Sequence, residues 1–337
     1  MKIAFFGTPE FAWEILSGIL KFPEVEVSLV VSQPDMPVGR KQILEATAVK
    51  KVALHAWIHV LQPEKIKKNN EFHTYLRELH LDFIVVVAYG KIIPTSILDI
   101  PKYGCINIHG SILPKYRGAS PVQAAIKSGE RETWLTIMFM SQGMDEWDML
   151  SVGKVNVDNV DTSVEIFRKF VKIGPDLLVS TLHWVISGNI KWIPQDDTKA
   201  TYCSKISRED GQIFFQKQSA QDIYNTYRSY TPWPWIYSFY EGKRFVIEEI
   251  EPHPNPLLEE REKATIQMQP LSPWGERIQE WGFTSWSLIK IEKNRYGIVC
   301  ADKKVLEVKQ VKLEGKKSMD MASFANGNRG VVAYTFQ

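Results

Sequence analysis

An uninterrupted apolar run, Phe83-Ile84-Val85-Val86-Val87, constrains the fold of this chain more than any other feature. A strand that lacks alternating polar residues is buried on both faces, as in a parallel sheet covered by helices. Further apolar strands are expected at 2–6, 25–31 and 105–109, and segments with helical periodicity separate them. This alternation predicts an α/β fold, an open sheet with helices on both faces.

The helices are expected at residues 46–55, 70–80, 121–128 and 163–187, the last with a break or kink at Gly174-Pro175. After the first strand, Thr8 is expected to cap a helix that begins at Pro9. The turn at Gly7 is not the G-x-G-x-x-G fingerprint, so no nicotinamide cofactor is inferred.

The pattern changes towards the C-terminus. Residues 189–209 are polar and are expected to form a linker between an N-terminal domain, 1–188, and a C-terminal domain, 210–330. Short strands at 236–240, 244–250, 285–291, 297–301 and 305–313 predict a small barrel or sandwich. Residues 252–282 are rich in proline and charge, and we interpret them as a flexible insert without a function of its own.

Composition narrows the functional classes. The net charge of +2 does not by itself indicate nucleic-acid binding. The sequence holds no apolar stretch of about 20 residues, so no membrane partner is expected. Three widely spaced cysteines fit a reducing cytoplasm and offer no metal-spaced pair, so no metal site is expected.

Asn107 and His109 end the strand at 105–109, and Asp145 follows in a polar segment. Two-residue spacing on a strand directs both side chains to one face. An amide, an imidazole and a carboxylate together can stabilise an oxyanion and manage one proton, which suits acyl transfer to an amine. A lone Asn-x-His at a strand end is more often structural, so the neighbouring residues must decide.

With these neighbours included, the chain resembles the methionyl-tRNA formyltransferases along nearly its whole length outside the insert. The matching motifs are Phe6-Gly7-Thr8-Pro9-Glu10-Phe11, Gln33-Pro34-Asp35, Pro37-Val38-Gly39-Arg40, Val86-Val87-Ala88-Tyr89-Gly90, Gly104-Cys105-Ile106-Asn107-Ile108-His109-Gly110-Ser111, Tyr116-Arg117-Gly118-Ala119, Pro232-Trp233-Pro234 and Leu313-Glu314-Gly315-Lys316-Lys317. The resemblance implies a Rossmann-like open-sheet formyltransferase domain followed by a small C-terminal β-barrel (OB-like) domain that binds tRNA. It also implies formyl transfer from 10-formyltetrahydrofolate to the α-amine of methionine on initiator tRNA by a cytoplasmic monomer.

By matching position, the resemblance implies that Asn107, His109 and Asp145 are catalytic. It places the folate along Val87, Ala88, Tyr89 and Gly90 and beside Ser111, Ile112, Leu113 and Pro114. It places tRNA against Arg40 and Lys41. A second basic region runs from residue 290 to 317, where nine Lys or Arg minus four Asp or Glu leave +5. Within it we expect tRNA contacts from Lys303, Lys304, Lys316 and Lys317.

The chain departs from the family pattern where Trp134 and Trp147 replace glycines. If the backbone at Trp147 needed a positive φ, the Asp145 segment would shift. Two alternatives to the tRNA enzyme therefore stay open. One is a sugar-nucleotide N-formyltransferase, and the other is a catalytically impaired homologue that binds folate or tRNA.

Overall fold

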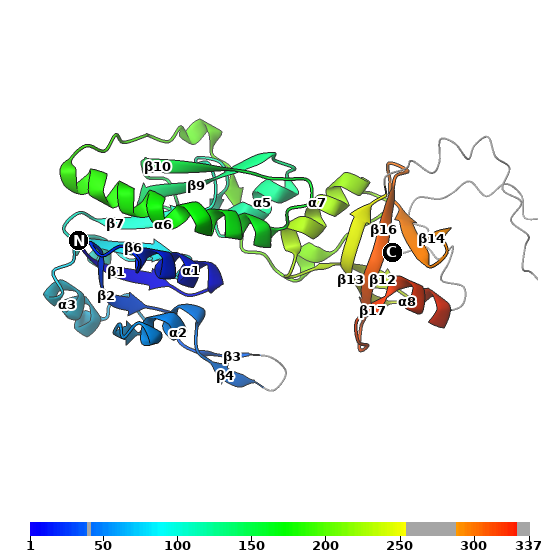
Figure 1. Cartoon of the computed structure of the whole chain (residues 1–337), viewed down its shortest axis with the longest axis horizontal. Helices are drawn as coiled ribbons and strands as arrows, with labels where there is room; N and C mark the ends of the chain where they lie inside the picture. The colour runs from blue at the N-terminus through cyan, green and yellow to red at the C-terminus, as the bar shows by residue number, and fades with distance from the viewer. Residues whose placement is uncertain (39–41, 254–287, 329–337) are drawn as a thin grey trace, which may run out of the picture. The chain divides into compact units, whose positions relative to one another are not determined.

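A computed structural model describes residues 1–38, 42–253 and 288–328. The chain divides into two compact units. The first contains residues 1–125, 130–159 and 165–205, and the second contains 126–129, 160–164 and the chain from 206 onward. Each unit is described separately below, with the element labels of Figure 1.

The first unit is built on a seven-stranded sheet in the order β10-β9-β7-β6-β1-β2-β5. Strands β5, β2, β1, β6 and β7 pair in parallel, and β9 and β10 add an antiparallel edge. The strands are β1 (Lys2–Gly7), β2 (Glu26–Val31), β5 (Val60–Leu61), β6 (Phe83–Val87), β7 (Cys105–His109), β9 (Glu132–Phe139) and β10 (Met149–Asn156). The predicted Rossmann-like open sheet is confirmed.

Successive residues of a strand point to opposite faces of the sheet, and helices pack against both faces. Phe6, Val86 and other residues of one face pack with α3 (Asn70–Glu78) and α4 (Thr95–Leu98). On the other face, Leu135 of β9 lies against Gly174 of α6 (Ser163–Ser187). The remaining helices that precede α6 are α1 (Glu10–Ile19), α2 (Ala48–His55) and α5 (Pro121–Lys127).

Helices α1 and α6 approach each other closely at two glycines. A Cβ on Gly18 of α1 would lie 2.2 Å from Cγ of Pro175, and one on Gly174 would lie 2.6 Å from Cδ1 of Ile15. Helix α6 continues through Pro175, so the helix has no break there, and the alternative of a kink at Gly174-Pro175 stays a prediction. The predicted Thr8 cap was wrong. Pro9 holds the N-cap position of α1, and the Thr8 hydroxyl donates to the Tyr89 carbonyl.

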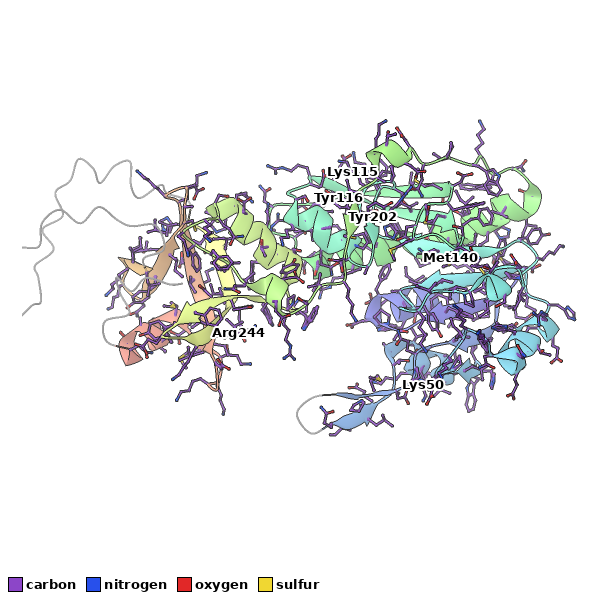
Figure 2. The ribbon with its side chains drawn as sticks, turned by 180° about the vertical axis from the view of Figure 1, so that it is seen from behind. Lys50, Lys115, Tyr116, Met140, Tyr202 and Arg244 are labelled. Carbon is purple, nitrogen blue, oxygen red and sulfur yellow. The ribbon has the colours of Figure 1, made fainter. Side chains whose placement is uncertain are left out.

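The segment predicted as a linker is paired with the first unit up to Lys205. Its β11 (Tyr202–Cys203) pairs in parallel with β8 (Arg117–Gly118), and Ile193 forms a bridge with Met149. Figure 2 labels Tyr202 of β11 and Tyr116, the residue that precedes β8. A short helix, η1 (Asp197–Lys199), lies between the two contacts. A hairpin of β3 (Met36–Val38) and β4 (Ile43–Glu45) completes the first unit.

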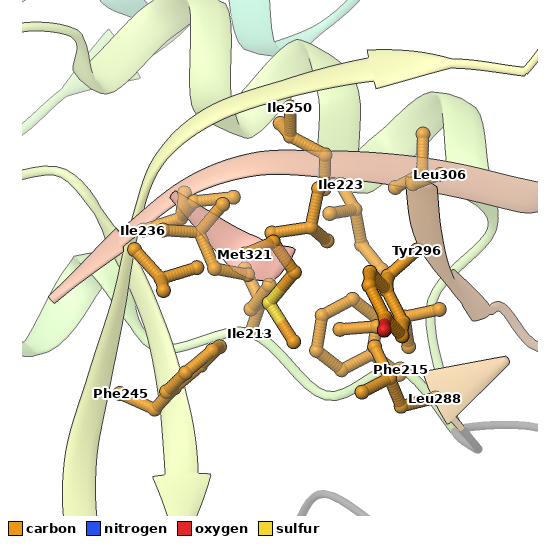
Figure 3. Packing of buried hydrophobic residues seen from close by; sticks show 14 of the residues in the cluster. Ile213, Phe215, Ile223, Ile236, Phe245, Ile250, Leu288, Tyr296, Leu306 and Met321 are labelled. Carbon is orange, nitrogen blue, oxygen red and sulfur yellow. The ribbon is translucent and has the colours of Figure 1, made fainter. Parts of the chain in front are cut away.

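The second unit is an antiparallel sheet in the order β12-β13-β16-β15-β14, with β17 paired to β16. Its elements are η2 (Glu209–Gly211), α7 (Ala220–Tyr230), β12 (Ile236–Tyr240), β13 (Lys243–Pro252), β14 (Leu288–Glu292), β15 (Arg295–Val299), β16 (Val305–Leu313), β17 (Met319–Asp320) and α8 (Met321–Gly327). Figure 3 shows its core, where Phe215, Phe245 and Met321 pack together with residues of the sheet. The predicted C-terminal domain of short strands is confirmed as an antiparallel sheet, and closure of that sheet into a barrel stays a prediction. Most of the predicted insert lies outside the described residues.

Candidate active site

The structure brings together Asn107, His109 and Asp145. Asn107 and His109 share one face at the carboxyl end of β7, and Asp145 lies on the loop between β9 and β10. Asn107 Nδ2 donates to Asp145 Oδ1 over 3.4 Å, and His109 Nδ1 lies 3.6 Å from Asp145 Oδ2. The predicted amide, imidazole and carboxylate therefore form one cluster at the end of a parallel strand, where sites of this fold class form.

Backbone groups of β8 and the preceding residue fix two members of this cluster. His109 Nε2 lies 3.0 Å from the carbonyl oxygen of Tyr116. Because a carbonyl oxygen only accepts, this nitrogen carries a proton and Nδ1 faces the carboxylate. The amide N–H of Gly118 donates to Asp145 Oδ2 over 2.8 Å. The imidazole, 5% exposed, and the carboxylate are thus both oriented by residues 116–118.

The backbone strain in this loop falls on Asp145 and not on Trp147. Asp145 has φ of 54°, whereas Trp147 is not among the residues with positive φ. Aspartate tolerates the left-handed region better than most residues. The Trp147 side chain is 48% exposed. Trp147 therefore occupies an ordinary backbone conformation, and the tryptophan does not by itself displace Asp145.

Gln195, which contacts the Asp145 loop, was not predicted from the sequence, and neither was the role of Arg117, which contacts Gln195. Gln195 Nε2 donates to the carbonyl oxygens of Asp145 over 2.8 Å and of Trp147 over 2.6 Å. Gln195 Oε1 accepts two hydrogen bonds from the buried guanidinium of Arg117. Arg117 belongs to a motif that the sequence analysis recognised, whereas no pattern singled out Gln195 in a segment that was interpreted as a linker.

The residues predicted to bind folate divide into two groups. The side chains of Val87, Tyr89, Ser111 and Leu113 are buried, and the Ser111 hydroxyl donates to the Lys115 carbonyl. Ala88 and Gly90 are exposed, and Ile112 and Pro114 are partly exposed. A ligand at these strand ends would therefore meet the backbone and these four residues.

Gly90 is required by the protein's own packing. It has φ of 80°, and a Cβ there would lie 2.5 Å from Nε2 of Gln33. That amide group donates to the Tyr89 carbonyl over 2.8 Å, and the Thr8 hydroxyl donates to the same oxygen. The ends of β1, β2 and β6 are thereby tied together beside the cluster.

The residues predicted to bind tRNA lie in both parts of the chain. Arg40 and Lys41 fall outside the described residues. Lys303, Lys304, Lys316 and Lys317 are exposed in the second unit. Lys304 lies 3.9 Å from Asp302, and two other cations of that basic region are also paired, because Arg295 contacts Glu307 and Lys309 contacts Glu251.

The described part of the chain offers neither a cluster of metal ligands nor a membrane-spanning helix. Within it, no group of three or more His, Cys, Asp or Glu side chains is placed to hold a metal ion. No helix in those ranges has the length and apolar character needed to cross a bilayer.

Comparison with known proteins gives agreement along the whole chain. Residues 1–182 match the family model described as formyl transferase, and residues 205–329 match formyl transferase, C-terminal domain. The chain is 40% identical to the methionyl-tRNA formyltransferase of Caldicellulosiruptor saccharolyticus, covering 97% of each sequence. It is 38% identical to that of Acidobacterium capsulatum, again covering 97% of each.

Solved structures show the same fold at lower identity. The sugar 3N-formyl transferase WlaRD, solved with dTDP and 5-N-formyl-THF, gives a TM-score of 0.60 at 18% identity, covering 94% of this chain and 99% of that one. Methionyl-tRNA formyltransferase from Clostridium thermocellum gives 0.53 at 17% identity, covering 74% and 93%. At these identities the structural likeness concerns the fold alone.

Proposed function

This chain belongs to the methionyl-tRNA formyltransferase family, and we propose that Asn107, His109 and Asp145 carry out its reaction. That reaction transfers a formyl group from 10-formyltetrahydrofolate to the α-amine of methionine on initiator tRNA, for translation initiation. The observation that carries the proposal is the cluster itself, in which Asp145 lies within 3.6 Å of both the Asn107 amide and the His109 imidazole.

The three side chains would divide the chemistry as follows. The neutral amine attacks the formyl carbon, a new C–N bond forms, and the formyl oxygen becomes an oxyanion. Asn107 Nδ2 carries two hydrogens and faces Asp145 with one, so the second is available to the oxyanion. His109, when doubly protonated, donates a hydrogen bond from Nδ1 to the oxyanion, while Nε2 still donates to the Tyr116 carbonyl.

Asp145 would handle the proton. Its carboxylate accepts the proton lost by the amine, through a water molecule, and its charge balances the imidazolium. When the tetrahedral intermediate collapses, the bond to the folate nitrogen breaks and that nitrogen takes up the proton that Asp145 had accepted. The formylated amine and tetrahydrofolate leave, and the three side chains return to their initial protonation states.

Folate would lie along the exposed backbone at residues 88–90 and 112–114, beside the cluster. The four residues that are accessible there, Ala88, Gly90, Ile112 and Pro114, suit contact with a flat heterocycle. The buried side chains of the other four predicted residues would shape that wall from behind.

Several further features complete the proposal. Initiator tRNA would contact Arg40 and Lys41 and the exposed lysines 303, 304, 316 and 317. The chain would act as a cytoplasmic monomer without metal. The catalytic domain would be 1–188 and the tRNA-binding domain 210–330, joined by 189–209. The exposed cationic side chains in the second unit support the tRNA contact, because phosphates attract such residues.

The test is formylation of methionyl initiator tRNA with 10-formyltetrahydrofolate by the parent chain and by His109→Ala. Losing one oxyanion donor is expected to lower kcat about 10²–10³-fold. His183→Ala, a change at a half-exposed histidine on α6, is the matched control and should retain activity. Absence of turnover by the parent would refute the function. Turnover with an amino-sugar nucleotide in place of tRNA would identify the alternative substrate.

A further inference from the structure

The geometry points to a role for Gln195 and Arg117 as positioning residues, which hold the Asp145 loop in its active conformation. The inference deepens the proposed function and rests on it for the activity measurement. It reassigns part of the segment predicted as a linker, since Gln195 acts within the first unit. The two residues form what we call the Arg117–Gln195 clamp.

Gln195 spans the loop at two points. Its Nε2 donates to the Asp145 carbonyl over 2.8 Å and to the Trp147 carbonyl over 2.6 Å. These contacts lie on both sides of Glu146, so they fix the path of the backbone through the loop. A single amide group therefore restrains the residue that carries the carboxylate and the residue two positions later.

Arg117 sets the orientation of that amide. Its Nε and Nη2 donate to Gln195 Oε1 over 3.0 and 2.7 Å, and Nη2 also reaches Asp197 over 2.6 Å. Because a guanidinium only donates, the amide oxygen must face Arg117 and the NH₂ group must face the loop. The Arg117 side chain is 2% exposed, so an unpaired guanidinium would be costly there. The burial of Arg117 therefore favours the conformation in which its hydrogen bonds to Gln195 and Asp197 are formed.

The side chains of this loop are mostly exposed, so its backbone contacts matter for its conformation. Met144, Glu146 and Trp147 are exposed, so the loop contributes little to the core. Asp145 has φ of 54°, a conformation that persists only where the surroundings enforce it. The Gly118 N–H holds the carboxylate itself, and the two hydrogen bonds from Gln195 restrain the backbone that carries it.

Three consecutive residues organise the whole cluster. The Tyr116 carbonyl holds His109, the Arg117 side chain holds Gln195, and the Gly118 N–H holds the Asp145 carboxylate. Residues 117–118 form β8, which pairs with β11 from the segment that supplies Gln195. The pairing of β8 with β11 therefore connects the clamp to the backbone group that holds the Asp145 carboxylate.

Gln195→Glu tests the clamp with minimal change in shape. The new carboxylate keeps acceptors for Arg117 but has no N–H group for the two loop carbonyls, which it would repel. We expect kcat to fall about 10- to 100-fold, equivalent to about 1.4–2.7 kcal/mol. The KM for tRNA should change by less than about twofold, because uniform substrate binding is not altered. Asp196→Asn, a change at the adjacent residue that keeps an oxygen acceptor for the Thr198 N–H at the start of η1, is the control and should match the parent.

Hydrogen exchange provides a readout that does not depend on turnover. Gln195→Glu should raise amide exchange in residues 143–148 and leave β9 protected, whereas a general loss of stability would raise both. Arg117→Lys, which loses the paired hydrogen bonds from Nε and Nη2 to Gln195 Oε1, should produce the same local change.

The outcomes separate the two proposals. Parent turnover with equal turnover by Gln195→Glu would overturn the clamp and leave the function intact. Exchange that rises in β9 as much as in the loop would also overturn it, since the residue would then be merely structural. No turnover by the parent would instead refute the function, and local exchange alone would still decide whether the clamp holds the loop.

Discussion

Replacing Gly118 by alanine tests whether the contact between β8 and β11 controls the position of the catalytic carboxylate. Gly118 has φ of 118°, and a Cβ there would lie 2.2 Å from the Cys203 carbonyl oxygen. Contacts under 3.0 Å are essentially never seen for a real Cβ, so the two strands must separate by about 0.8 Å or more. The obstacle is backbone, which a rotamer change cannot relieve.

The size of the effect follows from that shift. Overpacking of this kind costs about 1–3 kcal/mol, and the unfavourable φ adds about 1–2 kcal/mol. Because the Gly118 N–H holds Asp145 Oδ2, the same displacement moves the carboxylate. Misplacement by about 1 Å costs about 10²-fold in rate, so kcat should fall by that factor.

The assay measures both quantities on the same preparations. Urea unfolding gives the free energy of unfolding, and formylation of methionyl initiator tRNA gives kcat. Gly188→Ala is the matched control, because Gly188 also has a positive φ, 72°, but a Cβ there would meet nothing within 4 Å. It should lose about 1 kcal/mol and keep full activity. The reasoning is refuted if Gly118→Ala keeps kcat within about threefold, since 1.36 kcal/mol corresponds to tenfold.

Three further predictions concern stability. Tyr89 is 1% exposed, and its hydroxyl is buried without a hydrogen-bond partner among the described residues, so Tyr89→Phe should raise the free energy of unfolding in urea by about 1 kcal/mol. Burial raises the pKa of this phenol to about 12, so the stability that depends on its neutral form is complete below pH 10. Titration of unfolding should show that stability lost between about pH 10 and 12 in the parent but not in the variant, and identical alkaline profiles would contradict this. Arg295→Met leaves the Glu307 carboxylate unpaired and should cost about 1–3 kcal/mol at pH 7. Hydrogen bonding to Arg295 lowers the pKa of Glu307, so the difference between parent and variant should shrink as pH falls below about 4.5, and a constant difference in urea would argue against it. Gly18→Ala forces a Cβ to within 2.2 Å of Pro175 and should cost about 1–2 kcal/mol in thermal unfolding, whereas a higher Tm would show that the helices can separate.

Local patterns were sufficient for the strands that build the site. The segments that become β6 and β7 were predicted with their observed bounds. For β6 the reason is that burial on both faces leaves a continuous apolar signal. Two-residue spacing then placed Asn107 and His109 on one face, and the structure agrees. Their proximity to Asp145 came from the resemblance, since a separation of 38 residues leaves no periodic signal.

Thr8 shows how a long-range partner overrides a local preference. Thr-Pro after a strand favours a helix cap, because the hydroxyl can satisfy a free N–H of the first turn. In the fold, the end of β6 lies beside the end of β1, and the Tyr89 carbonyl accepts the hydroxyl instead. Pro9, which has no side-chain cap bond, takes the N-cap position. A sequence window that does not contain residue 89 cannot predict this exchange.

Gln195 shows the same limit at the functional site. A polar segment with proline is typical of a linker, and nothing in its composition distinguishes a solvated glutamine from one that bonds two carbonyls 48 and 50 residues away. Arg117 belongs to the motif Tyr116-Arg117-Gly118-Ala119, and its buried guanidinium needs an acceptor, which is the role that Gln195 fills. A buried arginine predicted from its motif therefore implies a polar partner elsewhere in the chain. In this protein that partner comes from the segment that a purely compositional analysis assigns no role.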